Sequence, residues 1–131
     1  MRLLLDTHIW IWVVSEKRRL SRIILRELDN PRNEVYLSPI SIWEAGWSER
    51  RGRWIARPDF ATWLRTALTE RPLLEATFTS EVGEEAAAIE LPQPDAGDTF
   101  LVATARVYGL TLITTDPQLL ACSWLRTMPN E

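Results

Sequence analysis

The chain has 131 residues, 46% of them hydrophobic, and this size predicts a single domain over residues 1–131 and excludes a second one. One cysteine, Cys122, excludes an intrachain disulfide framework, and no apolar stretch reaches the roughly eighteen residues of a membrane span. The formal net charge of −3 excludes a protein that binds nucleic acid through overall positive charge.

The first half of the chain alternates short apolar runs with amphipathic segments. Ser38 and Pro39 are typical of an N-cap and the first residue of a helix, and Gly52 is a typical stop after one. The predicted elements are, in order, a strand over 2–5, a helix over 7–15, a helix capped by Ser21 and running to about 28, a strand over 34–38 and a helix from 39 to about 51.

The second half continues the same rhythm, which favours an α/β fold with a mainly parallel sheet. Proline punctuates it: Pro58 opens one helix, and Pro92 and Pro94 form a rigid loop before another. The predicted elements are a helix from 58, a strand over 73–77, a helix from 80 to 91, a helix from about 95 to Tyr108 and Gly109, and strands over 110–115 and 125–128.

Four acidic residues fall where a parallel sheet would gather them at one edge. Asp6 and Asp116 each end a predicted strand, and ligands of open α/β sheets bind outside the carboxyl ends of the strands. Glu44 interrupts the apolar side of its helix, and Asp98 lies at a helix start, where the dipole favours an ionised carboxylate. Two carboxylates about 4 Å apart repel by roughly 4 kcal/mol. The cluster therefore predicts a bound cation, and oxygen ligands suit Mg²⁺ or Mn²⁺.

Each acid also has a simpler interpretation when it is taken alone. Asp6 and Asp98 could cap helices, Asp116 before Pro117 could open a turn, and Glu44 could lie on the surface of an amphipathic helix. These separate interpretations do not explain why all four acids fall at the same edge of the predicted sheet.

The acids and the residues around them resemble the PIN-domain ribonucleases, and most closely the VapC-type toxins of prokaryotic toxin–antitoxin pairs. The resemblance covers essentially the whole chain and rests on four motifs in order: Leu3-Leu-Leu-Asp6-Thr-His8, Ser41-Ile-Trp-Glu44, Asp95-Ala-Gly-Asp98 and Leu112-Ile-Thr-Thr-Asp116. Asp6, Glu44, Asp98 and Asp116 match the acidic quartet of the family, Thr114 a hydroxyl residue near the last acid, and Asp95 an additional acid. Thr99 departs from a frequent arginine, and Trp47 from an aliphatic residue.

The resemblance implies a three-layer α/β/α fold and metal-dependent hydrolysis of RNA. It implies that Asp6, Asp98 and Asp116 hold Mg²⁺, while Glu44 orients the attacking water or completes a second metal site. It also implies a homodimer and a cognate protein antitoxin. His8 is left out of the site, because a lone histidine beside such a cluster is more often a packed helix residue.

Two alternatives remain beside the toxin nuclease. One is a non-catalytic PIN-like binding module, which the complete quartet disfavours, and the other is a housekeeping nuclease for RNA processing. A phosphatase with Asp6 as its nucleophile is a weaker interpretation, because His8 stands where such enzymes carry a second aspartate.

The basic and aromatic residues bear on partners. Fourteen of the 15 basic residues are arginine, dense around residues 49–57, which reflects either genome composition or contacts to phosphate. Seven tryptophans are too many to hide easily in a small domain, so we expect another chain to cover some of them, with RNA stacking as the rival use. The lone cysteine and the lack of a basic leader predict a cytoplasmic protein.

Overall fold

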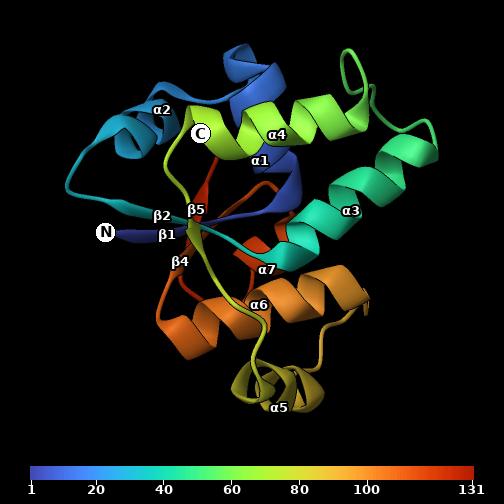
Figure 1. Ribbon diagram of the computed structural model, residues 1–131. Helices are drawn as coiled ribbons and strands as arrows, with labels where there is room; N and C mark the ends of the chain where they lie inside the picture. The colour runs from blue at the N-terminus through green and yellow to red at the C-terminus, as the bar shows by residue number, and fades with distance from the viewer.

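A five-stranded sheet in the order β3-β2-β1-β4-β5 forms the centre of the computed structural model, which describes all 131 residues (Figure 1). All neighbouring strands pair in parallel. The strands are β1 Arg2–Leu5, β2 Glu34–Leu37, β3 Leu74–Glu75, β4 Thr111–Thr114 and β5 Thr127–Pro129. The chain adds strands on one side of β1 and then on the other, so the strand order reverses between β1 and β4. Such a switch point opens a crevice at the carboxyl ends of the two strands.

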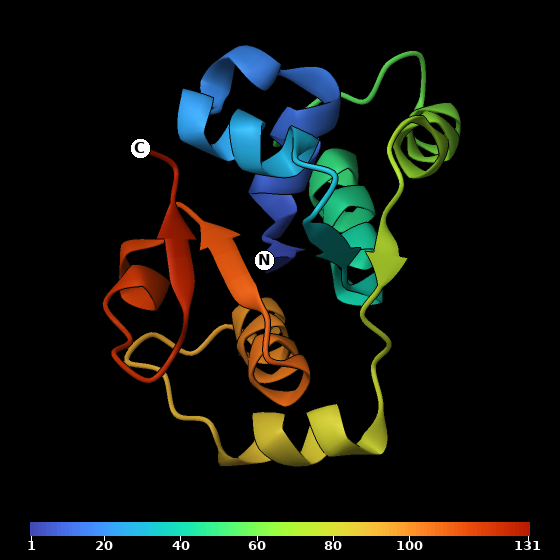
Figure 2. The ribbon, with the colours of Figure 1, turned by 90° about the vertical axis from the view of Figure 1, so that its left-hand side faces the viewer.

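Helices cover both faces of the sheet, which confirms the predicted α/β architecture with a parallel sheet. In Figure 1, α1, α2 and α4 lie on one side and α6 and α7 on the other, while α3 contacts both α1 and α6. Figure 2 shows α5 outside α6, which separates it from the sheet. The helices are α1 Thr7–Ser15, the 3-10 helix η1 Lys17–Arg19, α2 Arg22–Asp29, α3 Pro39–Arg50, α4 Phe60–Glu70, α5 Ser80–Ala88, α6 Ala96–Tyr108 and α7 Pro117–Leu120.

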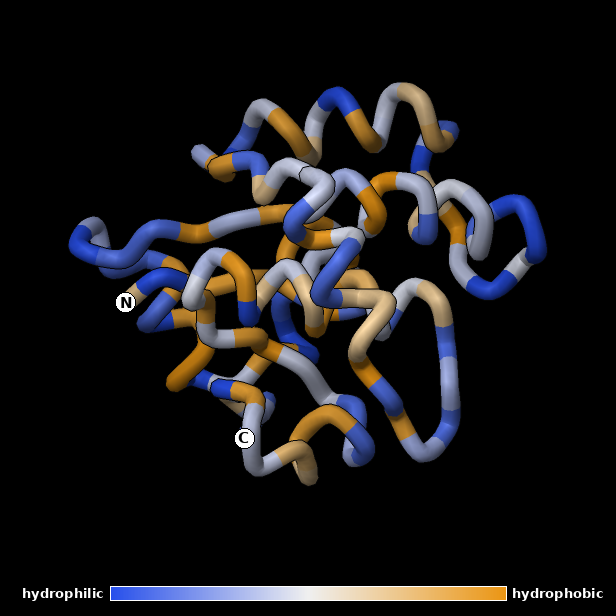
Figure 3. Tube along the Cα trace, turned by 90° about the horizontal axis from the view of Figure 1, so that it is seen from below, coloured by the Kyte–Doolittle hydropathy of each residue, from blue (hydrophilic) through white to orange (hydrophobic).

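The apolar run of β1 feeds two separate cores, because successive strand residues point to opposite faces. Leu3 and Leu5 pack with the first group of helices, whereas Leu4 packs with α6 and α7. A strand buried on both faces needs a continuous apolar run, which is what β1 has. Figure 3 shows hydrophobic residues gathered toward the middle of the molecule and hydrophilic ones on its outer loops. No helix is long and apolar enough to cross a membrane.

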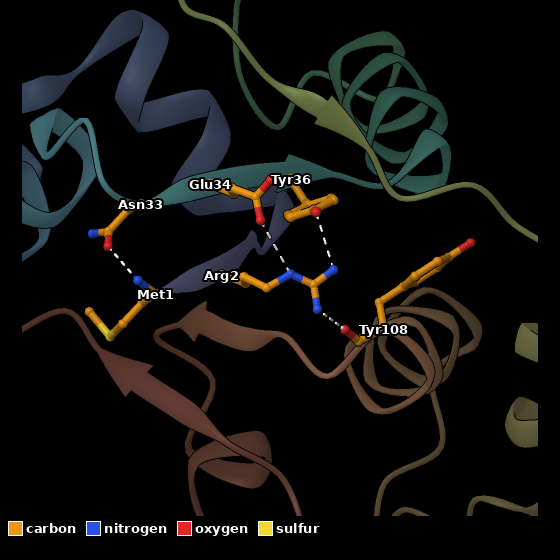
Figure 4. Close-up of polar contacts among 6 residues, drawn as sticks. All are labelled: Met1, Arg2, Asn33, Glu34, Tyr36 and Tyr108. Carbon is orange, nitrogen blue, oxygen red and sulfur yellow. Dashed lines mark hydrogen bonds and ion pairs between the residues drawn. The ribbon is translucent and has the colours of Figure 1, made fainter.

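Arg2 ties three elements together at the amino edge of the sheet (Figure 4). Its guanidinium donates to the carbonyl oxygen of Tyr108 at the end of α6 at 2.7 Å and to the hydroxyl of Tyr36 in β2 at 3.2 Å. The same side chain lies 3.4 Å from Oε1 of Glu34. These contacts join β1, β2 and α6 at the end of the sheet opposite the carboxyl ends of its strands.

Most predicted boundaries agree with the structure to within two residues, but the predictions around α5 and β3 were too long. The helix predicted to reach Leu91 ends at Ala88. Leu91 belongs to the core beside α6, so the chain must leave α5 earlier to bring that side chain inward. The strand predicted over 73–77 is limited to Leu74–Glu75, at the edge of the sheet. The helices η1 and α7 were not predicted.

Candidate functional site

All four acids of the predicted quartet line one cavity of about 930 Å³ at the carboxyl edge of the sheet. Asp6 follows β1, Asp116 lies two residues after β4, and these two strands flank the switch point. Glu44 comes from the second turn of α3, and Asp98 from the first turn of α6. Four elements that are distant in sequence therefore bring their carboxylates to one place. Asp95 and His8 line the same cavity.

Asp6 is the most buried of the four carboxylates, with 8% of the residue exposed. Its Oδ1 accepts from the backbone N–H of Thr7 at 2.7 Å, and its Oδ2 accepts from the hydroxyl of Thr114 at 2.6 Å. Burial raises the pKa of Asp6, and the two hydrogen bonds oppose that rise. The side chain is thus fixed in position by two donors while its ionisation remains unfavourable without a compensating positive charge.

Glu44 is held by the first residues of α1. The hydroxyl of Thr7 donates to its Oε1 at 2.7 Å and lies 2.9 Å from the hydroxyl of Ser41. Burial raises the pKa of Glu44, the hydrogen bond from Thr7 lowers it, and the charges of Asp6 and Asp95 raise it. The other oxygen, Oε2, packs against the first turn of α6 so closely that a Cβ at Gly97 would overlap it.

Asp98 has a strongly raised pKa, and the nearby carboxylates contribute to it. Burial raises its pKa to about 7, followed in effect by the charges of Asp6, Asp95 and Asp116 and by a hydrogen bond with Asp116. Burial and, after it, repulsion by the neighbouring carboxylates thus favour the protonated form of Asp98 up to near neutral pH. A cation in the cavity would remove that penalty.

The helix-cap interpretations hold for some of the acids and fail for Asp98. Asp6 caps α1, and Asp116 caps α7 by accepting from the backbone N–H of Gln118 at 2.9 Å. The N-cap of α6 is Asp95, whose Oδ1 accepts from the backbone N–H of Asp98 at 3.0 Å. Asp98 itself therefore points its charge to the cavity without a capping role.

Three residues at the site were not predicted as part of it: Thr7, Ser41 and Gly97. Thr7 and Ser41 stand in the motifs beside Asp6 and Glu44, but a hydroxyl next to an acid is too common to be informative. Gly97 carried a better signal, because glycine in the first turn of a helix lowers its stability and needs a reason. Close packing of Glu44 is that reason.

The four carboxylates offer an all-oxygen donor set, the kind that Mg²⁺ and Mn²⁺ prefer. No group of three or more His, Cys, Asp or Glu side chains is already arranged so that it could hold a metal ion. The donors therefore suit such an ion by their chemistry, while their side chains would need to draw closer around it.

Several solved structures share this fold. VapBC2 from Rickettsia felis, solved with a DNA fragment from the promoter, superposes with a TM-score of 0.74 at 13% identity over 100% of both chains. VapBC-1 from nontypeable Haemophilus influenzae gives 0.71 at 16% identity over 98% of both chains. A toxin–antitoxin complex from Klebsiella pneumoniae gives 0.64 at 22% identity over 92% of both chains.

At these identities the likeness establishes the shared fold alone. No curated protein matches the chain at the sequence level. Residues 3–124, however, match the family model of the PIN domain, and this range includes all four acids and every element except β5. The chain therefore belongs to the PIN domain family.

Proposed function

We propose that this PIN domain is a metal-dependent endoribonuclease and the toxin of a toxin–antitoxin pair. The observation that carries the proposal is the convergence of Asp6, Glu44, Asp98 and Asp116 on one cavity at the switch point of the sheet. The raised pKa of Asp98, at about 7, supports it, because burial and the repulsion by neighbouring carboxylates both disfavour the ionised form, and a divalent cation would offset both. A phosphodiester is the matching substrate, since its oxygens complete the shell of a partly hydrated Mg²⁺.

Mg²⁺ is the proposed ion, with Mn²⁺ as its substitute, and Asp6, Asp98 and Asp116 are its proposed ligands. When bound, it would acidify a water molecule and offset charge on the scissile phosphate. Glu44 is proposed to orient that water or to complete a second metal site. The hydrogen bond from Thr7 to its Oε1 holds the side chain in position for this task.

The residues around the acids prepare the site before any ligand arrives. Thr114 and the backbone of Thr7 fix both oxygens of Asp6, so its orientation is set by the fold. Since its pKa is raised to about 7, Asp98 can hold or release a proton near neutral pH, and its ionised form would be the one that serves as a ligand. No side chain is required to form a covalent bond with the RNA.

The test combines activity with a binding measurement. Purified protein should cleave structured RNA, such as transfer or ribosomal RNA, with Mg²⁺ or Mn²⁺ and lose cleavage in excess chelator. Asp98→Asn should reduce cleavage by about a hundredfold or more, because removal of one ligand weakens metal binding. Mn²⁺ should raise the melting temperature of the wild type and leave that of the variant unchanged. Undiminished cleavage in excess chelator would rule out the metal mechanism.

The toxin assignment draws on the toxin–antitoxin complexes that share the fold. Its proposed partners are an RNA substrate, a cognate protein antitoxin and a second copy of the chain, in the cytoplasm. Induced expression should arrest bacterial growth, and expression of Asp98→Asn to the same level should not. Normal growth with the active wild-type enzyme would favour the RNA-processing alternative, whereas a protein without cleavage activity would favour the non-catalytic module.

A further inference from the structure

The wall of the cavity beyond the acids is aromatic and cationic. It includes Trp47, Trp54 and Ile55 together with Arg53 and Arg57, so carboxylates, aromatic rings and guanidinium groups line one cavity. Trp47 lies three residues after Glu44 on α3, which places the two on neighbouring turns of the same helix face. Trp47 therefore lines the same cavity as the acids and lies close to Glu44.

Trp47 forms half of a stacked pair of indoles. Its ring centroid lies 5.9 Å from that of Trp43, with an angle of 25° between the ring planes. Trp43 is 55% exposed, which is unusual for so large an apolar residue. Trp47 thus lines the cavity, and Trp43 stacks on it from outside with its own ring exposed to solvent.

Packing of the core does not explain the exposure of Trp43. Trp10 and Trp63 are buried, with 0% and 5% of each residue exposed. Trp54 is anchored through its indole N–H, which donates to the carbonyl oxygen of Ala45 at 3.0 Å. Trp43 has neither burial nor an anchor of this kind.

Two arginines lie over the ring of Trp47, and they take part in no salt bridge. The guanidinium carbons of Arg51 and Arg53 lie 4.3 Å and 4.9 Å from the centroid of the Trp47 ring. None of the exposed Arg50, Arg51, Arg53 and Arg57 takes part in a salt bridge, although four other arginines of the chain do. Unpaired guanidinium groups on Trp47, next to the exposed ring of Trp43, complement a ligand that has both phosphates and flat rings.

We propose that Trp43 and Trp47 form a stacking platform for an unpaired base of single-stranded RNA, whose flanking phosphates contact the arginines of residues 50–57. The inference rests on the proposed function, because it specifies the substrate as RNA unpaired beside the scissile bond. Stacking on an aromatic ring accepts any base, while the arginines neutralise the backbone. A base in a regular duplex cannot reach the platform, since its faces are already covered by its neighbours.

The experiment measures binding apart from cleavage. Every protein carries Asp98→Asn to stop hydrolysis, and the RNA, a ten-nucleotide unstructured strand with one 2-aminopurine, is checked on a gel afterwards. Stacking quenches 2-aminopurine, so its fluorescence reports both affinity and base contact. We expect Trp43→Leu to weaken binding about tenfold and to lose the quenching, and Trp43→Phe to retain both.

Two controls separate stacking from other effects. Trp124 is also exposed, at 44%, and has the guanidinium of Arg106 at 5.0 Å from its ring, but it lies at a different cavity between α6 and the segment before β5. Trp124→Leu should therefore bind RNA as the parent does. An abasic strand of the same length retains the phosphates without the bases, and we expect Trp43→Leu to bind it with unchanged affinity.

Three results would overturn the proposal. Equal affinity of Trp43→Leu and its parent for the RNA would leave the indoles to a protein partner. Equal losses for the RNA and the abasic strand would show an effect on charge or folding. A molar mass of Trp43→Leu that differs from that of its parent in light scattering would assign Trp43 to a contact between copies of the chain. Cleavage by the wild type is measured separately, so a protein that stacks RNA without cutting it would contradict the proposed function alone.

Discussion

Asp98 makes the stability of the metal-free protein depend on pH. Its pKa rises from the ordinary value of 3.8 to about 7 in the folded protein, so the folded state binds this proton more tightly than the unfolded state. The resulting stability is fully present below about pH 4 and is lost as the pH rises through about 7. The raised pKa values of Asp6 and Glu44 act in the same direction.

We therefore expect metal-free wild-type protein to melt at a lower temperature at about pH 8 than at about pH 5, as measured by thermal denaturation in chelator. Asp98→Asn should flatten this dependence and match or exceed the wild type at the higher pH, because it removes the charge that is repelled. Mn²⁺ should reverse the trend for the wild type, since it binds the ionised form. A wild type that gains stability on going from pH 5 to 8 in chelator would contradict this account.

At Gly97 the addition of a single Cβ atom should change the activity of the protein. A Cβ there would overlap Oε2 of Glu44, so Gly97→Ala should push α6 and α3 apart and reduce RNA cleavage by about tenfold or more. Gly83 in α5 is the matched control, because a Cβ there meets nothing within 4 Å. Gly83→Ala should stabilise the protein by about 0.5–1 kcal/mol in urea denaturation, as expected for alanine in a helix, and leave cleavage unchanged. Equal activity of both variants would show that Glu44 does not depend on this contact.

The convergence of the four acids was predictable residue by residue. Of the groups that orient them, Thr114 was matched only through the family resemblance, and Thr7 was not predicted. Asp6 and Asp116 follow apolar runs, and the geometry of a parallel sheet then fixes where they lie. Thr7 and Thr114 depend on contacts across 37 and 108 residues of sequence, respectively. No local pattern contains such distances, and threonine is common in strands and helix starts for other reasons.

At the scale of elements, α4 is attached to the rest of the molecule through Trp63. Its ring packs edge-on against Trp10 with centroids 5.1 Å apart, and its indole N–H donates to the hydroxyl of Ser15 at 2.7 Å. We expect Trp63→Ala to lower the free energy of unfolding by about 3–5 kcal/mol in urea denaturation. Trp43→Ala on α3 should change it by no more than about 0.5 kcal/mol, because that ring is exposed. Similar losses in both variants would mean that Trp43 also supports the fold.

Helices and strands were predictable where local signals and tertiary packing agreed. The caps of α2, α3 and α4 by Ser21, Ser38 and Asp59 are visible in the sequence, and Gly109 ends α6 with a positive φ of 65°. The end of α5 was not predictable, because no local signal shows that Leu91 belongs to the core beside α6. Asp116 and Pro117 predict a turn, and the structure has the short helix α7 there. A turn and the start of a short helix have the same local sequence signals, so the residues that follow decide between them.

At the scale of the whole molecule, a net charge of −3 hides an uneven distribution. Four carboxylates of the site line one cavity, and Arg53 and Arg57 from the arginine-rich segment 50–57 line it as well. Each phosphate contact to a single strand contributes about 0.7 to the slope of log affinity against log salt concentration. We expect Arg53→Gln to reduce that slope for the unstructured RNA by about this amount. Arg32→Gln, at the amino edge of the sheet, should not change it, and equal slopes for all three proteins would place the phosphates elsewhere.

The short outer strands restrict how another protein can attach to this one. The sheet ends in β3, with two residues, and β5, with three, and Pro129 in β5 has no N–H to donate. Partners that add a strand of their own need a longer row of unpaired main-chain groups, and such pairing depends little on side chains. The outer strands of this domain are too short for a partner to add a strand to the sheet. Any protein partner of this domain would therefore have to recognise the side chains on its helices and loops, and recognition of that kind is specific to one particular surface.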